Sequence, residues 1–461
     1  MSAPPSTDLQ RLIDRHGVGR LQRRVLLLCA GVLLLDGIDI AMVSYLAPSL
    51  MADWGLSKAQ LGPVVTSGLV GLALGSLVGG PLADRLGRRR IIIASLVFFG
   101  LMCAATALTT DIWWFSILRV LTGFGLGAAM PSSTTLVSEY APSRRRGVMM
   151  AIAYCGVTLG AALAGYLTSA MVQIASWHWA LIVGGVLPLA YAVVVHRWLP
   201  ESPKFLARRA DRADELAVLV NRMLPEPVPA GTRFTLDEPS TGAGVSVGGL
   251  LASRFRLGTA TIWLGFVAAF FIIYLVNSWL PILLTDVGFS LTATATIGVL
   301  LQLGATIGNF GIGWLMDRFG LHRTAAVGMA CAAVMLVLIA VAPPTMVVVG
   351  VLIFLLGVFL HPAGTGFPIL SAAFYPTAIR ATGTSWATGI ARIGAIGGAA
   401  AGTLLVALGL QYQQVFLVLL VPAAVTISAV VLKGRAARTP KATSDDTRDR
   451  RPEPLTADEP V

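Results

Sequence analysis

The sequence predicts an all-α membrane protein in which twelve transmembrane helices form two pseudo-symmetric six-helix bundles. Three observations lead to this fold. Of the 461 residues, 56% are hydrophobic and only 12% are charged, about half the charged share of a soluble domain. The apolar residues form long runs, and one long polar stretch divides these runs into two equal sets. Short motifs in the first set recur in the second.

The apolar runs define the expected spans. A helix that crosses a bilayer needs about 20 mainly apolar residues. In the first half the spans are residues 25–50, 61–83, 91–109, 113–138, 148–173 and 178–198. In the second half they are residues 258–284, 292–316, 323–342, 345–373, 383–408 and 412–432. We therefore expect an N-terminal bundle over residues 25–198 and a C-terminal bundle over residues 258–432.

Three polar segments lie outside the bundles. They are an N-terminal tail over residues 1–24, a central loop over residues 199–257 and a C-terminal tail over residues 433–461. The C-terminal tail is rich in Arg, Asp and Pro, so it cannot bury an apolar core, and we expect it to be disordered. The central loop is too short and too polar to form a catalytic domain.

The basic residues indicate an orientation. The net charge is +11, yet only Lys58 falls in the loops on one side of the membrane. Apart from Arg119 and Arg392, which lie within spans, the other basic residues lie in the opposite loops and in the tails. Cytoplasmic loops carry such an excess of Lys and Arg. We expect a multi-pass protein of the cell inner membrane, with both termini in the cytoplasm and no nucleic-acid partner.

A glycine-bounded loop motif follows the second span and recurs after the eighth. Residues 80–87 read Gly-Pro-Leu-Ala-Asp-Arg-Leu-Gly, and residues 313–320 read Gly-Trp-Leu-Met-Asp-Arg-Phe-Gly. Glycine permits the positive φ of a tight turn, and charges at a helix end can pair with a neighbouring helix. We expect a gating latch that holds one closed state and is released when the bundles move. Its first members are Asp84, Arg85, Asp317 and Arg318.

Further latch residues follow spans four and ten. A Pro-x-x-x-Arg pattern that ends at Arg146 recurs with its end at Arg380. Glu139 lies just before the first of these patterns, near the loop that follows span two. We expect Glu139 to pair with Arg85 or a neighbour of Arg85, and a proton relay through Glu139 is the alternative.

These features resemble the major facilitator superfamily of transporters. The resemblance covers about residues 20–435. It rests on the twelve spans, the loop motif with its copy, and Leu-Pro-Glu-Ser-Pro at residues 199–203. It implies a fold in which two six-helix bundles rock about a site near the middle of the membrane. A fold shared by many transporters does not identify the solute.

Two carboxylates lie within the first span. Asp36 and Asp39 are three positions apart, so they share one face of a helix. Asp36 lies about 18 Å into the span at a rise of 1.5 Å per residue. Charged groups at such a depth are costly, and two neighbouring carboxylates in a medium of low dielectric constant cannot both ionise easily. We therefore expect this pair to carry protons, and a pair that only links helices by salt bridges is the alternative.

The carboxylates belong to a pattern that resembles the aromatic acid:proton symporter family. Asp-Gly-Ile-Asp at residues 36–39 matches the first-span motif of that family, with Ile38 where an aromatic residue is usual. Further matches lie at residues 118–127, 130–131, 139–142, 278–281 and 389–394. The resemblance implies that protons accompany a small aromatic carboxylate, such as a hydroxybenzoate, protocatechuate or gentisate, into the cell.

Arg119 and Arg392 are the two cations within the spans. A guanidinium binds a carboxylate through two parallel hydrogen bonds. Arg392 lies in the middle of its span, and we expect it to bind the substrate carboxylate, with a structural role as the alternative. For Arg119, proton coupling or a structural role competes with substrate binding.

Other side chains are candidates for substrate contact. His361 lies deep in the tenth span, where relaying protons, binding substrate and packing are all open to it. Aromatic side chains can stack on an aromatic ring, and we select Tyr45 and Trp386 for this role. The wider set of aromatic candidates is Phe270, Phe271, Tyr274, Trp279 and Phe367.

Alternative functions stay open at this point. A symporter for a sugar, a polyol or a dicarboxylate would share the Pro-Glu-Ser-Pro segment, although span seven lacks the paired glutamines usual in sugar porters. In span five, Gly156, Gly160 and Ala164 permit close helix contact, but the Gly-Pro ending typical of drug exporters is absent. We expect no enzyme, because no metal-ligand cluster, nucleophile elbow or nucleotide loop is present. We also expect no cofactor, no bound metal, and a monomer in the lipid bilayer.

Overall fold

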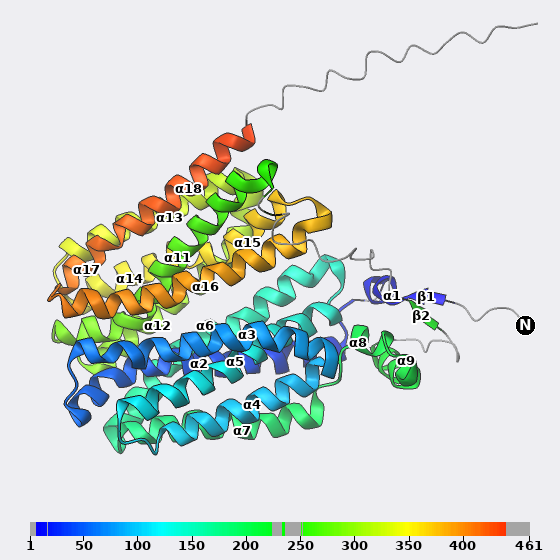
Figure 1. Cartoon of the computed structure of the whole chain (residues 1–461), viewed down its shortest axis with the longest axis horizontal. Helices are drawn as coiled ribbons and strands as arrows, with labels where there is room; N and C mark the ends of the chain where they lie inside the picture. The colour runs from blue at the N-terminus through cyan, green and yellow to red at the C-terminus, as the bar shows by residue number, and fades with distance from the viewer. Residues whose placement is uncertain (1–5, 16, 224–232, 236–249, 251, 439–461) are drawn as a thin grey trace, which may run out of the picture.

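The structure is a computed structural model that describes residues 6–15, 17–223, 233–235, 250 and 252–438. Within these residues, twelve helical segments are long and apolar enough to cross a membrane, which confirms the predicted number of spans. They form two bundles that lie side by side, with the N-terminal bundle below the C-terminal bundle in Figure 1. The predicted all-α fold is therefore confirmed.

Each bundle contains six spans. The N-terminal bundle consists of α2 (Arg20–Trp54), α3 (Gly62–Leu86), α4 (Arg88–Thr106), α5 (Ile112–Tyr140), α6 (Arg146–Ile174) and α7 (Trp177–Trp198). The C-terminal bundle consists of α11 (Ser253–Asp286), α12 (Leu291–Phe319), α13 (Leu321–Val341), α14 (Met346–Leu360), α15 (Pro362–Phe374), α16 (Thr377–Ala407), α17 (Tyr412–Val418) and α18 (Leu420–Arg438). One span joins α14 to α15, and another joins α17 to α18. The first of these breaks falls at Pro362, which lacks a backbone N–H and suits the start of a helix.

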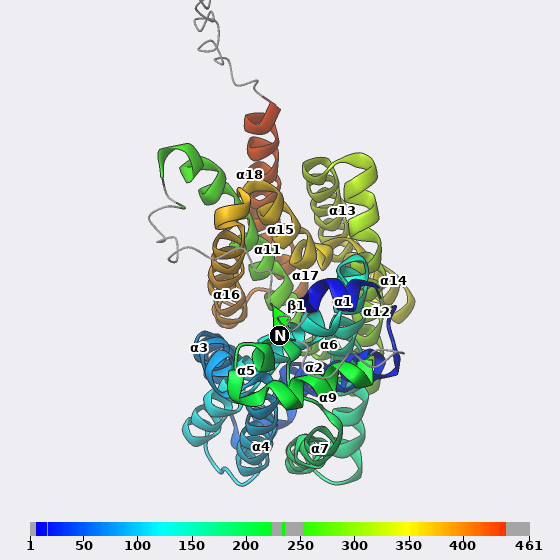
Figure 2. The same cartoon turned by 90° about the vertical axis from the view of Figure 1, so that its right-hand side faces the viewer.

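Short elements gather at the two ends of the bundles. The end with η1 (Lys58–Leu61) and the turn between α11 and α12 is called the loop end. The opposite end, called the tail end, carries α1 (Leu9–Arg15), η2 (Ser143–Arg145), α8 (Pro203–Ala207), η3 (Ala210–Arg212) and α9 (Ala213–Met223). It lies at the right of Figure 1 and faces the viewer in Figure 2. There β1 (Ser6–Asp8) pairs in parallel with β2 (Arg233–Thr235), which joins the N-terminal segment to the central one.

Some helices extend beyond the predicted spans. α2 begins at Arg20 rather than at residue 25, and α18 continues to Arg438, into the segment predicted as a disordered tail. Arg and Lys are good helix formers, so a helix need not end where its apolar run ends. The remainder of that predicted tail, residues 439–461, lies outside the described residues.

The central segment contains α8 and α9, which the prediction of a polar loop over residues 199–257 did not include. α9 has one apolar face, because Leu216, Leu219, Val220 and Met223 are all buried. Their spacing of three and four positions is that of one helix face packed on a protein surface. The signal was present in the sequence within a stretch whose overall composition is polar.

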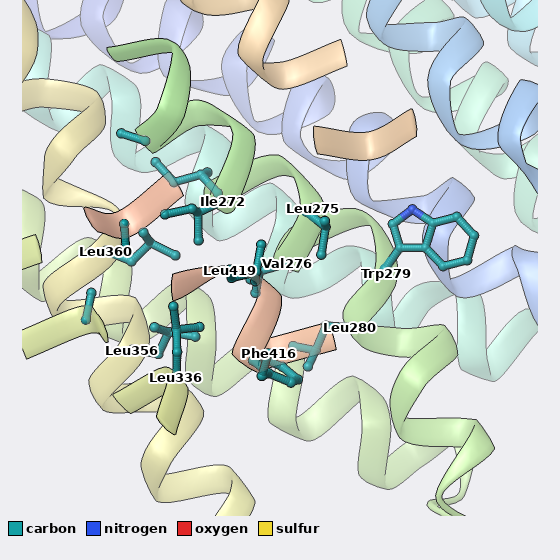
Figure 3. Close-up of a cluster of buried hydrophobic side chains, with 14 of the residues drawn as sticks. Ile272, Leu275, Val276, Trp279, Leu280, Leu336, Leu356, Leu360, Phe416 and Leu419 are labelled. Carbon is teal, nitrogen blue, oxygen red and sulfur yellow. The ribbon is translucent and has the colours of Figure 1, made fainter. Parts of the chain in front are cut away.

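Each bundle has its own apolar core. In the C-terminal bundle the core is centred on α11, and Ile272, Val276 and Leu280 belong to one buried cluster with residues of α13, α14 and α17 (Figure 3). Two further clusters fill the N-terminal bundle. A small cluster of Val65 and Leu69 with Ala399 lies between the bundles. The C-terminal cluster also includes Ala47 and Leu61 of the N-terminal half, so apolar side chains join the two bundles near the loop end.

α2 and α6 approach each other at backbone contact distance. A Cβ atom on Gly160 would lie 2.0 Å from the carbonyl oxygen of Leu34, and one on Gly37 would lie 2.1 Å from the carbonyl oxygen of Val157. A side chain at either position would push the helices apart. This confirms the close contact expected of the small residues in span five. It also fixes the segment around Gly37, which lies between the two carboxylates of α2.

Candidate functional site

Asp39 and Arg119 form a buried ion pair inside the N-terminal bundle. Nη1 of Arg119 donates to Oδ1 of Asp39 at 2.8 Å, and Nη2 donates to Oδ2 at 2.7 Å. The side chains are only 2% and 3% exposed. Such a two-bonded pair holds both groups in one geometry. Because both Nη atoms of Arg119 already donate to the Asp39 carboxylate, the geometry favours the coupling or structural role for Arg119 over substrate binding.

Asp36 lies on the same helix, nearer the tail end. The residue is 1% exposed, and neither carboxylate oxygen has a hydrogen-bond partner among the described residues. Asp36 lies within electrostatic range of Asp39 and of Arg392, which belongs to α16 in the other bundle. Arg392 itself makes no hydrogen bond or ion pair within the described part of the chain. A carboxylate and a guanidinium, neither with a direct partner, therefore lie near each other at the bundle interface.

Two tyrosines lie beside this pair. Tyr154 on α6 and Tyr274 on α11 are each within electrostatic range of both Asp36 and Arg392. The four side chains come from two helices of each bundle, so they surround one position between the bundles. Tyr154 is 40% exposed, so the described residues do not fully cover its side chain. Tyr274 is among the aromatic candidates from the sequence but Tyr154 is not, although a tyrosine in the first third of a small-residue span was a visible signal.

A second polar group lies in the C-terminal bundle. Nε2 of Gln302 on α12 donates to Oδ1 of Asn277 on α11 at 2.8 Å. Nδ2 of Asn277 lies 3.2 Å from Nε2 of His361, at the junction of α14 and α15. His361 was selected from the sequence. Asn277 and Gln302 were not, although amide side chains within apolar spans could have drawn attention to them.

Tyr45 and Trp386 are not brought to the position beside Asp36 and Arg392. Tyr45 lies nine residues beyond Asp36, about 13 Å along α2. Its ring packs across the interface, where a Cβ atom on Gly298 of α12 would lie 1.8 Å from its hydroxyl oxygen. Trp386 lies six residues before Arg392, about 9 Å along α16, and is 43% exposed. Stacking of substrate on either ring stays a prediction.

The bundles are joined at the loop end. Lys58 of η1 forms an ion pair with Asp286 of α11 at 2.6 Å. Further side-chain contacts between the bundles join Tyr166 to Thr296 at 3.1 Å and Gln173 to Thr292 at 3.2 Å. Together with the Tyr45 ring, these contacts lie on the loop-end side of Asp36 and Arg392. The structure is therefore a conformation in which the bundles are closed against each other at the loop end.

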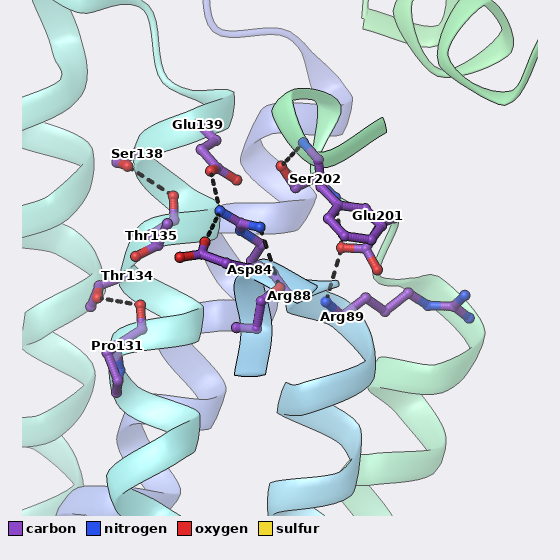
Figure 4. Close-up of polar contacts among 12 residues, drawn as sticks. Asp84, Arg88, Arg89, Pro131, Thr134, Thr135, Ser138, Glu139, Glu201 and Ser202 are labelled. Atoms are coloured by element: carbon purple, nitrogen blue, oxygen red, sulfur yellow. Dashed lines mark hydrogen bonds and ion pairs between the residues drawn. The ribbon is translucent and has the colours of Figure 1, made fainter. Parts of the chain in front are cut away.

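The charged residues expected to form a latch in the N-terminal bundle pair through Arg88 and not through Arg85 (Figure 4), and a gating role for this triad stays a prediction. Nη2 of Arg88 donates to Oδ1 of Asp84 at 2.6 Å and lies 3.3 Å from Oε1 of Glu139. The Arg88 side chain is 7% exposed, whereas Arg85 is exposed and takes no side-chain part in this triad. Neighbouring residues of a helix point in different directions, so Arg85 cannot share the direction of Asp84. The expected pairing of Glu139 with a neighbour of Arg85 is confirmed.

The Pro-Glu-Ser-Pro segment supports the same corner. Oε1 of Glu201 accepts from the backbone N–H of Arg89 at 3.1 Å, at the start of α4. The hydroxyl of Tyr140 donates to the carbonyl oxygen of Glu201 at 2.6 Å. A carboxylate at a helix N-terminus satisfies a free backbone donor and interacts well with the helix dipole. Glu201 thereby ties the end of α7 to α4 and α5.

The C-terminal copy of the loop has the same turn but not the same pairing. Gly87 and Gly320 have φ angles of 102° and 88°, which confirms the predicted positive-φ turn in both halves. Asp317 is exposed and makes no ion pair with the described residues. The Arg318 guanidinium instead lies over the rings of Trp314 and Phe319, at 5.6 and 5.8 Å.

The two repeated arginines contact other groups. Nη2 of Arg146 donates to Oε1 of Gln10 on α1 at 3.1 Å, and Nε of Arg380 donates to the carbonyl oxygen of Tyr375 at 3.3 Å. Neither contact reaches Asp84 or Glu139. A latch role for these arginines and for the Asp317 loop stays a prediction.

α1 is held on η2 by Asp14. Oδ1 of Asp14 accepts from the backbone N–H of Ser143 at 2.7 Å, and Oδ2 accepts from its hydroxyl at 2.8 Å. Burial alone would raise the pKa of Asp14, but the hydrogen bonds from Ser143 and Gln10 and the charge of Arg146 leave this pKa below its usual value. The ionised carboxylate therefore stabilises α1 on the tail end of α5 and α6.

Comparison with known proteins identifies the family. The model of the Major Facilitator Superfamily matches residues 27–396 and 262–457. This chain belongs to the major facilitator superfamily, and like the proteins below it is a transporter and not an enzyme. The 4-hydroxybenzoate transporter PcaK of Pseudomonas putida is 39% identical over 434 residues, which are 94% of this chain and 97% of that protein. The gallate transporter of Pseudomonas putida is 39% identical over 431 residues, 93% of this chain and 95% of that protein.

A solved structure shares the fold. The xylose transporter XylE from E. coli, in an inward-open conformation, has a TM-score of 0.67 and 17% sequence identity. The match covers 92% of this chain and 98% of that one. At this identity the likeness concerns the arrangement of the spans and not the solute.

Proposed function

We propose that this protein imports small aromatic carboxylates together with protons by alternating access. The observation that carries the proposal is the position between the bundles where Asp36 and Arg392 lie near each other without direct partners. A guanidinium suits a carboxylate ligand, and a buried carboxylate suits a proton. The relatives named above are transporters of 4-hydroxybenzoate and of gallate. We therefore expect a hydroxybenzoate, protocatechuate, gentisate or similar acid as the substrate.

The orientation follows from the charge distribution. The tail end carries the basic loops and tails, so we place it in the cytoplasm and the loop end outside. The protein then lies in the cell inner membrane with both termini in the cytoplasm, and it acts as a monomer. In this orientation the conformation described above is closed toward the outside, and its bound solute would leave toward the cytoplasm.

Binding and proton uptake are coupled at one position. Arg392 binds the substrate carboxylate, and Tyr154 and Tyr274 flank the aromatic ring. Asp36 takes a proton, because an ionised carboxylate without a partner is costly where water is excluded. The buried pair of Asp39 and Arg119 holds the segment rigid and places a second carboxylate within electrostatic range.

Closure depends on the net charge at this position. An anion that enters against a membrane potential, negative inside, meets opposition of about 2.3 kcal/mol per charge for each 100 mV. More than one accompanying proton reverses this penalty. With the charges of Asp36 and the substrate neutralised, the loop-end contacts of Tyr45 and Lys58 can form. The ion pairs of Asp84, Arg88 and Glu139 at the cytoplasmic end are then released, and the site opens toward the cytoplasm.

The test is uptake of radiolabelled 4-hydroxybenzoate and protocatechuate by proteoliposomes, with and without an inward proton gradient. We expect accumulation that collapses with a protonophore. Asp36→Asn should lower gradient-driven accumulation by about 100-fold, since the proton carrier is lost. Asp211→Asn, in the exposed η3 segment, is the matched control and should transport normally.

Two outcomes would contradict the proposal. Full proton-driven uptake by correctly inserted Asp36→Asn would exclude Asp36 as the proton carrier. No uptake of either acid by folded wild-type protein would exclude the substrate class. A screen of sugars, polyols and dicarboxylates, and of drug export, would then follow.

A further inference from the structure

The polar group of the C-terminal bundle comes from three different helices. Asn277 lies on α11, Gln302 on α12 and His361 between α14 and α15, and their hydrogen bonds measure 2.8 and 3.2 Å. All three side chains are partly buried at the middle depth of spans that are otherwise strongly apolar. Polar side chains inside a membrane are costly, and an ionisable one such as His361 is by default a candidate functional residue.

Two independent helices relate this group to the substrate position, one turn away along α11 and two turns away by way of α12 and α6. On α11, Asn277 follows Tyr274 by three residues, and residues at this spacing share a helix face. On α12, Gln302 lies one turn from Thr306, whose hydroxyl donates to Thr158 of α6 at 2.9 Å. Thr158 in turn lies one turn from Tyr154. Both tyrosines are within electrostatic range of Arg392.

The separation between the two places suits one small aromatic molecule. A helical turn spans about 5.4 Å, so the separation is about one turn along α11 and about two turns by way of α12 and α6. An aromatic acid whose carboxylate binds Arg392 therefore extends its ring past Tyr154 and Tyr274. The far side of that ring then reaches the level of the amides and the imidazole.

Within the described residues, the hydrogen bonds of the group leave two donors, one on Gln302 and one on His361, and one acceptor on Gln302 without a partner. One hydrogen of Asn277 Nδ2 is donated to the carbonyl oxygen of Ile273 at 2.8 Å, and the other is directed to Nε2 of His361. A neutral imidazole whose Nε2 accepts carries its proton on Nδ1. Within the described residues, Nδ1 of His361 is buried without a partner, and Oε1 of Gln302 accepts no hydrogen bond.

A phenolic hydroxyl complements this pattern, because it accepts one hydrogen bond and donates another. Unsubstituted benzoate has no group that can do either at the far side of its ring. Buried polar atoms left unpaired are costly, so a site built for a hydroxyl disfavours the analogue that lacks it.

We propose that Asn277, Gln302 and His361 form a hydroxyl-recognition site that selects ring-hydroxylated aromatic carboxylates over benzoate. The inference rests on the proposed function and assigns the far end of the same substrate. Arg392 then binds the carboxylate, which all these aromatic acids share. The hydroxyl-recognition site distinguishes the acids that carry a ring hydroxyl from those that do not.

The test compares the affinities of 4-hydroxybenzoate and benzoate for the purified full-length protein in lipid nanodiscs. Gln302→Met and Asn277→Leu preserve side-chain size and remove the hydrogen-bonding groups. Asn309→Leu is the matched control, because Asn309 is also an amide on α12 and accepts a hydrogen bond from Thr365 at 3.2 Å. Thermal unfolding of each variant checks that it is folded, and either of the two test variants alone is sufficient.

We expect the wild-type protein to bind 4-hydroxybenzoate roughly 10- to 100-fold more tightly than benzoate. In the two test variants this ratio should fall close to one while the affinity for benzoate stays within about threefold of wild type. The Asn309→Leu protein should keep the wild-type ratio.

Other results would overturn the inference. A variant that loses affinity for both acids equally would show a structural role for the hydroxyl-recognition site. An unchanged ratio would show that the hydroxyl is bound elsewhere, with the proposed function intact. If folded wild-type protein bound neither acid, the proposed function itself would fail, and this inference with it.

Discussion

The two bundles share one plan but carry different chemistry at equivalent places. The N-terminal bundle holds its charges in closed sets, the buried pair of Asp39 with Arg119 and the triad around Arg88. The C-terminal bundle carries Arg392 without a direct partner and a group of neutral polar side chains. The difference indicates a division of work. Under the proposed function, the N-terminal half handles protons and its own charges, and the C-terminal half recognises the solute.

The loop motif shows the same division at the tail end. In the N-terminal half the turn glycine is followed by Arg88, and in the C-terminal half Gly320 is followed by Leu321. Glu139 stands three residues before the proline that ends its helix, and the equivalent residue in the other half is Ala373. Both partners of the triad are thus replaced together by apolar residues. Asp317 remains exposed and is available for contacts in another conformation.

The largest expected effect comes from breaking the buried pair of the N-terminal bundle. Arg119→Gln leaves the Asp39 carboxylate buried without a counter-charge. Removing one partner of such a pair costs about 3–5 kcal/mol, so the thermal midpoint in detergent should fall by many degrees and uptake should be lost. The double variant Asp39→Asn with Arg119→Gln replaces the charges by amides that can bond each other. It should recover most of the thermal stability but not proton-driven uptake.

A double variant as unstable as Arg119→Gln alone would contradict this account. It would mean that the arginine matters for packing and not for neutralising Asp39. Recovery of both stability and uptake would show that Asp39 takes no part in proton coupling.

The spans and the loop motif could be predicted from the sequence because the forces behind them are local. Apolar length defines a span, and the positive φ of a tight turn favours glycine, as at Gly87 and Gly320. The carboxylates of the first span were also evident, because a charge in an apolar run is conspicuous.

The pairings could not be predicted in the same way, because they depend on rotation about helix axes and on tertiary approach. Arg85 and Arg88 are equally basic in the sequence, and only the packing of α4 against α5 directs Arg88 toward Glu139. From the sequence alone, Arg119 was an equally good candidate to bind substrate, and only the structure shows that it pairs with Asp39. Asn277 and Gln302 are neutral, so they gave a weaker signal than charged residues, and their contact joins different helices.

A smaller effect is expected when the N-terminal latch is made to resemble its C-terminal copy. Arg88→Leu leaves the Glu139 side chain, which is 8% exposed, without its cation. We expect a loss of about 2 kcal/mol in stability, mainly from Glu139, because the 62%-exposed Asp84 contributes little through its pair. Arg88→Leu with Glu139→Ala copies both positions of the other half. This double variant should melt near the wild-type temperature. If it were as unstable as Arg88→Leu alone, Arg88 would not act mainly by neutralising Glu139.

The smallest effect concerns the contact that joins the halves at the loop end. A Cβ atom on Gly298 would lie 1.8 Å from the hydroxyl oxygen of Tyr45 and 3.1 Å from Cζ. Gly298→Ala should therefore disfavour the closed conformation by about 1–3 kcal/mol and shift the population toward opening at the loop end. We expect uptake to fall about threefold to tenfold, with faster thiol labelling of a cysteine introduced on the loop-end surface between the bundles.

Two further variants test whether this contact acts by shape alone. Gly311→Ala lies on the same helix, where the nearest atom to a new Cβ is 4.0 Å away, so it should behave as wild type. Tyr45→Phe removes the oxygen that Gly298→Ala would strike, so the combined variant should recover uptake and slow labelling. If Tyr45→Phe did not rescue Gly298→Ala, the Tyr45 ring would not be the part of the N-terminal bundle that Gly298 accommodates. Closure at the loop end would then depend on the polar contacts of Lys58 and the threonines of α12 more than on the packing of the Tyr45 ring against Gly298.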